Sequence, residues 1–105
     1  MVAKRFSLRA RVSTENPTAV RRLLFQSVTG ASVKSTDDPQ ELLVEGRMAG
    51  ASARDLNRSL LTALRRVEKR TRLRSEWTIE ESTERFFDYV PKGKRRAPPN
   101  PSAQS

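Results

Sequence analysis

The first strand-like segment of this 105-residue chain alternates strictly between apolar and polar residues. Every second residue from Phe6 to Val12 is apolar, and Ser7, Arg9 and Arg11 lie between them. Because successive side chains of a β-strand point to opposite faces of a sheet, this pattern predicts a strand with one buried face. The polar residues then form either an exposed sheet face or an interface.

Two segments with helical periodicity follow. The pair Asn16-Pro17 is typical of a helix start, and Gly30 is placed to end that helix in a left-handed conformation. A second helix is predicted to begin after the capping residue Ser52 and to end near residues 70–72. Its buried face is formed by four apolar residues at helical spacing: Leu56, Leu60, Leu64 and Val67.

The remaining apolar segments favour strands at residues 31–35, 42–48, 77–79 and 86–90. Residues 81–83 are read as a hairpin turn, in preference to a bulge within one long strand. The resulting order, βαββαβ with a possible extra C-terminal strand, predicts an α+β fold of the ferredoxin-like split βαβ kind. Its two helices would cover one face of an antiparallel sheet. A different α+β order would apply if residues 31–36 form a loop.

The chain divides into a folded part and a tail. Residues 1–90 are predicted to form a single α+β domain. Residues 91–105 contain four of the six prolines, and no large apolar residue follows Val90. Such a segment buries too little surface to offset its ordering entropy, so it is predicted to be a disordered basic tail.

The composition excludes several classes of protein. The chain has no Cys and no His, so thiol nucleophiles, His-based triads, disulfide scaffolds and Cys/His zinc sites cannot form within it. No apolar run approaches the ~20 residues needed to span a bilayer. The first residues also lack the apolar stretch of a signal peptide. These features predict a cytoplasmic protein.

The formal net charge of +9 is distributed unevenly. Residues 54–74 and the tail are strongly basic, whereas residues 75–90 are acidic. If the second helix continues to residue 72, five cations lie on its outer face within an arc of roughly 60°. They are Arg54, Arg58, Arg65, Lys69 and Arg72, with Arg66 and Arg70 on one flank. Such a stripe could follow the phosphates of a nucleic acid, or it could be an ordinary solvated helix face.

Two further features bear on the surface. The acidic residues between positions 76 and 88 lack the spacing of a metal-binding loop, so they are read as exposed strand edges or as partners of Arg. Phe86 and Phe87 are adjacent and would face opposite sides of a strand. One is predicted to lie in the core. The other is exposed, covered by a second chain or available to stack on a base.

Known nucleotide-binding and catalytic motifs are absent. The RNA-recognition motif shares the βαββαβ order, but residues 42–48 carry none of its strand aromatics. Residues 46–50 are glycine-containing but lack the Lys-Ser/Thr of a phosphate loop. No arrangement of a nucleophile and a base stands out. The chain is therefore predicted to be no enzyme, with no cofactor, metal or small-molecule substrate.

These patterns favour a small nucleic-acid-binding protein that contacts the phosphates of RNA, or else DNA, with low sequence specificity. The predicted contacts are the helix residues Arg54, Arg58, Arg65, Arg66, Lys69, Arg70 and Arg72, and the tail residues Lys92, Lys94, Arg95 and Arg96. The alternative is a dimeric interaction module, or a subunit of a larger complex, that uses the polar sheet face. Its candidate interface residues are Arg9, Arg11, Leu43, Arg47, Phe86 and Phe87.

Residues 56–67, with the sequence LNRSLLTALRRV, resemble the long helix of the small dimer-forming subunit of the KEOPS tRNA-modification complex. That family pairs two copies of a compact α+β fold. The chain departs from it at Leu61, where the family has a characteristic Asn. The resemblance implies a homodimer or a small subunit of an RNA-processing complex.

Overall fold

The computed structural model describes residues 3–96, and residues 1–2 and 97–105 lie outside the described part. Two helices and six strands follow one another in the order βαββαβββ. Their bounds are β1 (Lys4–Ser13), α1 (Pro17–Ser27), β2 (Thr29–Ser35), β3 (Glu41–Gly50), α2 (Ala53–Val67), β4 (Arg72–Ile79), β5 (Ser82–Phe87) and β6 (Val90–Arg96). The predicted α+β class is confirmed.

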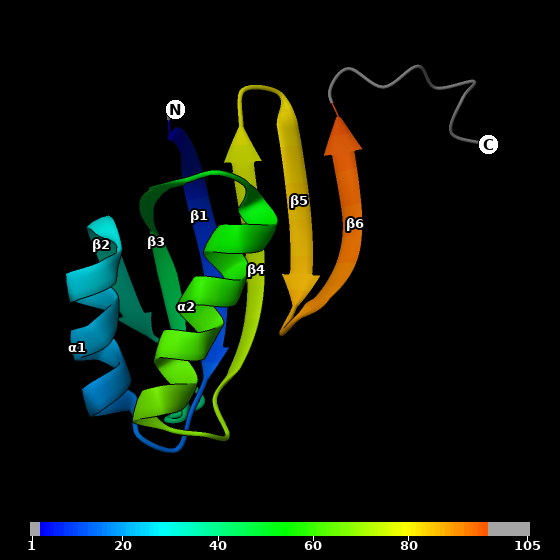
Figure 1. The fold of residues 1–105 in the computed structure, drawn as a ribbon. Coiled ribbons are helices and arrows are strands. Elements are labelled where there is room, and N and C mark those ends of the chain that lie inside the picture. Colours follow the sequence, from blue (N-terminus) through cyan, green and yellow to red (C-terminus); the bar gives the residue numbers. More distant parts are fainter. Residues whose placement is uncertain (1–2, 97–105) are drawn as a thin grey trace.

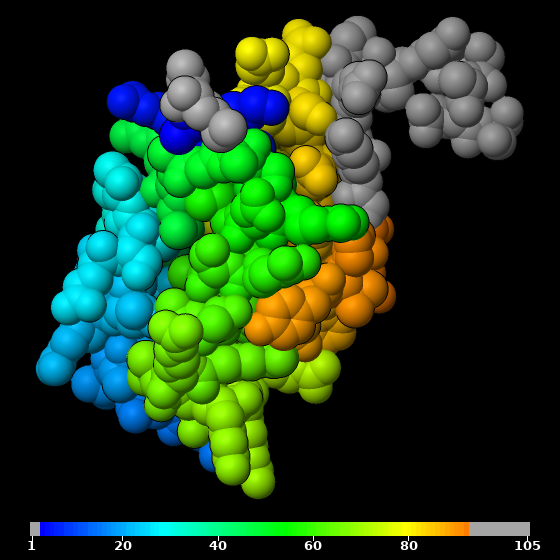
Figure 2. Space-filling model, in the orientation of Figure 1, coloured from blue at the N-terminus to red at the C-terminus, as the bar shows by residue number. Residues whose placement is uncertain are grey.

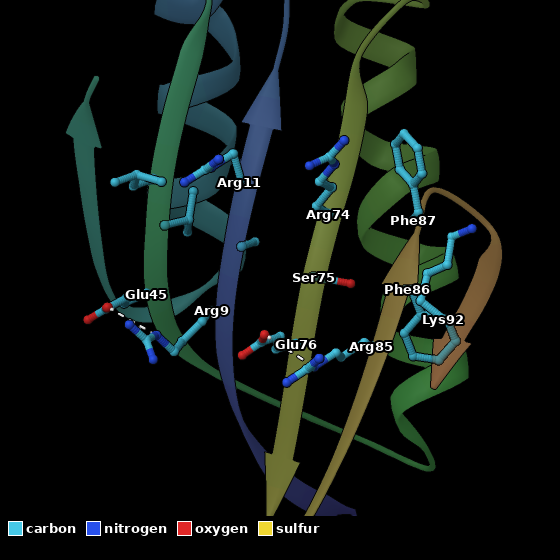
Figure 3. A pocket seen from close by; sticks show the side chains of 13 residues that line it. Arg9, Arg11, Glu45, Arg74, Ser75, Glu76, Arg85, Phe86, Phe87 and Lys92 are labelled. Atoms are coloured by element: carbon cyan, nitrogen blue, oxygen red, sulfur yellow. Dashed lines mark ion pairs between the residues drawn. The ribbon is translucent and has the colours of Figure 1, made fainter. Parts of the chain in front are cut away.

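All six strands form one antiparallel sheet with the order β2-β3-β1-β4-β5-β6. Both helices lie on the same face, and β5 and β6 continue the sheet beyond α2 (Figure 1). The order therefore differs from a simple four-stranded βαββαβ sheet by two C-terminal strands. The face away from the helices carries no covering element of the described chain, and we call it the open face (Figure 3).

The core lies between the helices and the sheet. The predicted alternation of β1 is confirmed, since Phe6, Leu8, Ala10 and Val12 are all buried. Leucines of α2 pack against these residues in the same core, and the indole of Trp77 on β4 is fully buried. Burying each such side chain stabilises the fold by roughly 1.5–3 kcal/mol. This one-sided core leaves the alternate residues of every central strand on the open face.

Both helices begin where their capping residues predict. The Asn16 side chain accepts a hydrogen bond from the Ala19 amide at 3.3 Å, and Ser52 accepts one from the Asp55 amide at 3.1 Å. The end of α1 differs from the expectation, because the chain is already extended at Val28. Gly30 does adopt a left-handed conformation, with φ +63°, but within the irregular start of β2.

Helix α2 ends earlier than expected, and this changes where its neighbouring cations lie. The helix was expected to reach residues 70–72, but it ends at Val67 and Glu68 is extended. The Glu68 carboxylate then accepts a bond from the Arg70 amide at 2.7 Å, and the Glu68 carbonyl accepts one from the Thr71 amide at 3.0 Å. This turn reverses the chain, so Arg72 begins strand β4.

The C-terminal strands form two successive hairpins. The expected hairpin is confirmed, but its turn lies at Glu80 and Glu81, with Glu80 in the left-handed region, and Ser82 and Thr83 already belong to β5. A second turn at Asp88, also left-handed, leads into β6. Pro91 through Arg96 therefore belong to a strand, where a disordered tail was expected from residue 91. The rest of that predicted tail, residues 97–105, lies outside the described residues.

A polar network holds the second turn against α2. The buried Asn57 amide donates to the Asp88 carbonyl at 2.7 Å, and its carbonyl oxygen accepts from Ser75 Oγ and Trp77 Nε1. The Asp88 carboxylate accepts a bond from the Leu73 amide at 2.9 Å. Figure 2 shows the turn, in orange, lying against α2, in green. The network places the end of β5, and with it Phe87, at a defined position on the sheet.

Candidate nucleic-acid interface

The cationic stripe predicted on α2 is not assembled as expected. Arg54, Arg58, Arg65 and Arg66 do lie on α2, but Lys69 and Arg70 lie in the following turn. Arg72 lies on β4 and shares the open face with its cross-strand partner Ser13. The reason is the early end of α2, which breaks the helical geometry on which the stripe depended.

Arg65 is occupied by contacts within the fold. Its Nε donates to the Thr71 carbonyl at 3.0 Å, and its Nη2 lies 3.4 Å from the Asp88 carboxylate. The guanidinium also stands over the ring of Tyr89, 5.4 Å from its centroid. Arg70 lies 3.5 Å from Glu15. Arg65 thus joins the turn before β4 to the turn after β5, and Arg70 forms an exposed ion pair, so fewer cations remain free on the helical side than the sequence suggested.

The charge of the described side chains is concentrated on the open face. There, nine cations face three carboxylates, a net charge of +6. Apart from Lys94, Arg95 and Arg96 on β6, the rest of residues 3–96 holds nine cations and nine carboxylates, which cancel. The open-face set is Arg5, Arg9, Arg11, Lys34, Arg47, Arg72, Arg74, Arg85 and Lys92, with Glu41, Glu45 and Glu76.

A broad groove of about 750 Å³ crosses the middle of this face, over β3, β1, β4, β5 and the start of β6. Its floor is the sheet, and its walls are long charged side chains (Figure 3). Two adjacent rows of cross-strand neighbours line it, and they differ sharply in how their charges are satisfied.

The first row is an alternating ladder of charges, which we call the paired row. Glu45, Arg9, Glu76 and Arg85 lie opposite one another on β3, β1, β4 and β5. Arg9 is 3.5 Å from Glu45, and Arg85 is 3.4 Å from Glu76. Its net charge is zero. Opposite charges in directly facing positions stabilise a sheet modestly, so this row is explained by the fold alone.

The second row, which we call the open row, consists of Leu43, Arg11, Arg74 and Phe87 on the same four strands. Arg11 and Arg74 are directly opposite each other on the two central strands, where like charges destabilise a sheet. Arg11 reaches only Glu41, at 3.7 Å, and Arg74 has no carboxylate within 4.0 Å among the described residues. Folding alone does not account for two facing guanidiniums, whereas a bound anion would.

Phe87 closes the open row with an aromatic ring among cations. The prediction that Phe86 and Phe87 face opposite sides is confirmed, since Phe86 is 5% exposed and packs in the core. The guanidiniums of Arg72 and Arg74 lie 5.0 and 4.9 Å from the Phe87 centroid, and Lys92 Nζ lies 5.9 Å from it. A half-buried ring bordered by cations at these distances can exchange one of those contacts for a stacked base.

Five of the six candidate interface residues lie on the open face, whereas Phe86 is buried in the core, so its assignment to the interface was wrong. Arg9, Arg11, Leu43 and Arg47 all lie on the open face, and Leu43 is 38% exposed. Sequence reasoning missed Arg74 and Arg85. The signal was present, because Arg72, Arg74, Glu76 and Thr78 alternate with buried residues in the same way as the first strand. The helical reading of residues 68–72 concealed the start of that alternation.

No family model, curated protein sequence or solved structure matches the chain. The resemblance of residues 56–67 to a KEOPS subunit therefore gains no support from these comparisons. Neither of the two helices in residues 3–96 is long and apolar enough to cross a membrane.

Proposed function

We propose that this protein binds single-stranded nucleic acid, RNA in preference to DNA, through the open face of its sheet and catalyses no reaction. The observation that carries the proposal is the open row, in which two facing guanidiniums without strong partners stand beside an accessible aromatic ring. Bound phosphates would supply to the open row the negative charges that Glu45 and Glu76 supply to the paired row. The open face thus replaces α2 as the main contact surface.

The shape and chemistry of the face favour an unpaired strand. The groove is lined by Arg and Lys side chains and by the ring of Phe87. An unpaired base can stack on this ring while the phosphates contact the guanidiniums. RNA is preferred because the exposed hydroxyls of Ser7 and Ser13 share the open face with the cations, where they can bond a 2′-hydroxyl. These contacts are few and backbone-directed, so low sequence specificity follows.

The alternative of a homodimer through the same face is electrostatically disfavoured. A two-fold interface places one surface patch against its own copy, so a net charge of +6 would face +6. Leu43 is the feature of the open row that suits such an interface. An acidic protein partner, as in a larger complex, would satisfy the charge, but it would give the half-buried ring of Phe87 no specific role.

Two finer assignments accompany the proposal. We infer that α1, α2 and the first four strands form a ferredoxin-like split βαβ unit, which the order β2-β3-β1-β4 among them supports. β5 and β6 would then be additions that widen the open face. A cytoplasmic location, consistent with an RNA ligand, stays a prediction.

Salt dependence tests the proposed function. Fluorescence anisotropy with a labelled oligouridylate should show binding that weakens steeply between about 50 and about 200 mM salt. With about four phosphate contacts on a single strand, log K should fall against log[salt] with a slope near −3. Light scattering in parallel should give the mass of one chain. Absence of binding at the lower salt concentration, or a salt-independent dimer, would refute the proposal.

A further inference from the structure

We propose that the open row contains a subsite for one unpaired nucleotide, with its base on Phe87 and its phosphate between Arg74 and Arg11. This inference rests on the proposed function and makes it more specific, because it requires a base as well as a polyanion. The register places Phe87 beside Arg74, and Arg74 beside Arg11. Adjacent strands are ~4.8 Å apart, so ring and guanidiniums lie within the span of a single nucleotide.

The cations around Phe87 differ in their freedom to move. Arg72 is held by the Asp88 carboxylate, 3.4 Å from its Nε. Arg74 and Lys92 lie near the ring and have no carboxylate within 4.0 Å among the described residues. A base that stacks on Phe87 therefore displaces one of these two cations. The displaced cation gains a charge-assisted hydrogen bond to the phosphate in place of a weaker contact with the ring.

The fold supports the ring from behind. Phe86 is buried in the core, and Asp88 is fixed by its bonds to Leu73 and Asn57, so the residues on both sides of Phe87 are held. Phe87 is thus presented on a rigid strand end, which lowers the ordering cost of stacking a base. In a duplex, bases are stacked on one another and their faces are covered, so the subsite selects single strands.

The test compares strands of equal charge with and without bases. The full chain is titrated with an oligothymidylate about eight nucleotides long and with an abasic deoxyribose-phosphate strand of the same length. Two variants follow: Phe87→Leu, and Phe25→Leu as a control, because Phe25 is 52% exposed on α1 at the helical side. Circular dichroism melts establish that both variants fold.

The subsite predicts that wild-type protein binds the base-bearing strand about tenfold more tightly than the abasic strand. Phe87→Leu should remove this preference while leaving the abasic affinity unchanged, and Phe25→Leu should preserve it. Equal binding of the two strands by wild-type protein would overturn the subsite but leave phosphate binding by the open face intact. Binding of neither strand at low salt would overturn both the subsite and the proposed function. The wild-type comparison is decisive even if a variant fails to fold.

Discussion

Replacing Arg11 and Arg74 together by glutamine is expected to weaken binding to single-stranded RNA by at least about 100-fold at low salt. Each guanidinium is predicted to make charge-assisted hydrogen bonds to phosphate, worth roughly 1.5–3 kcal/mol apiece. Tenfold in affinity corresponds to about 1.4 kcal/mol, so the loss of two such contacts gives this magnitude. The salt slope should also become shallower by about one to two, which anisotropy titrations at several salt concentrations would measure.

The stability of this variant separates a binding role from a structural one. Arg11 and Arg74 face each other as like charges, so their removal should leave the thermal midpoint unchanged or raise it slightly. The matched control is Arg54→Gln with Arg58→Gln, which removes the same charge from the exposed face of α2. That pair should change affinity by no more than about threefold, through long-range electrostatics. An equal loss of affinity in both double variants would indicate that the phosphates contact α2 as much as the open face, and would contradict the proposal.

The largest effect on stability is expected for Trp77→Ala, with a loss of about 3–5 kcal/mol. The indole is 0% exposed and is the largest side chain of the core. Its Nε1 donates to Asn57 Oδ1 at 3.3 Å and to Ser75 Oγ at 3.1 Å, so truncation leaves a cavity and weakens the network under the Asp88 turn. A domain of this size has only about 5–15 kcal/mol to lose.

Urea denaturation followed by far-UV circular dichroism measures this loss, because Trp77 is the chain's only tryptophan and its fluorescence disappears with it. Trp77→Phe is the graded comparison, since it retains most of the apolar volume and removes only the N–H donor and part of the ring. It should cost about half as much or less. A midpoint in Trp77→Ala close to that of wild type would contradict the described packing of α2 on β4.

The parts of this fold that local patterns determine could be read from the sequence. The strict alternation from Phe6 to Val12, and the caps Asn16 and Ser52, each depend on residues close together in the chain. The prediction that the polar face of the first strand is exposed is confirmed. Which residues lie beside it on the sheet depends on the pairing register of the strands, and a short stretch of sequence does not determine that register.

The errors have a common physical cause in long-range pairing. Helical geometry carried past Val67 placed Arg72 on a helix, although a turn at Glu68 redirects it to β4. Pro91 and its basic neighbours read as tail because they bury little, yet they pair with β5 at the edge of the sheet, where proline is tolerated. The net charge was expected on one face of the second helix and in the tail, and this placement was wrong because it depended on these two elements.

The central claim is that the open face, and not α2, receives the nucleic acid. Titration of ¹⁵N-labelled full-length protein with a short oligouridylate, followed by NMR chemical-shift mapping, tests it most directly. The account predicts that the largest perturbations cluster on β1, β4 and β5 around Arg11, Arg74 and Phe87, while Arg54 and Arg58 on α2 change little. Perturbations centred on α2 with an unaffected open row, or none at all at low salt, would contradict it.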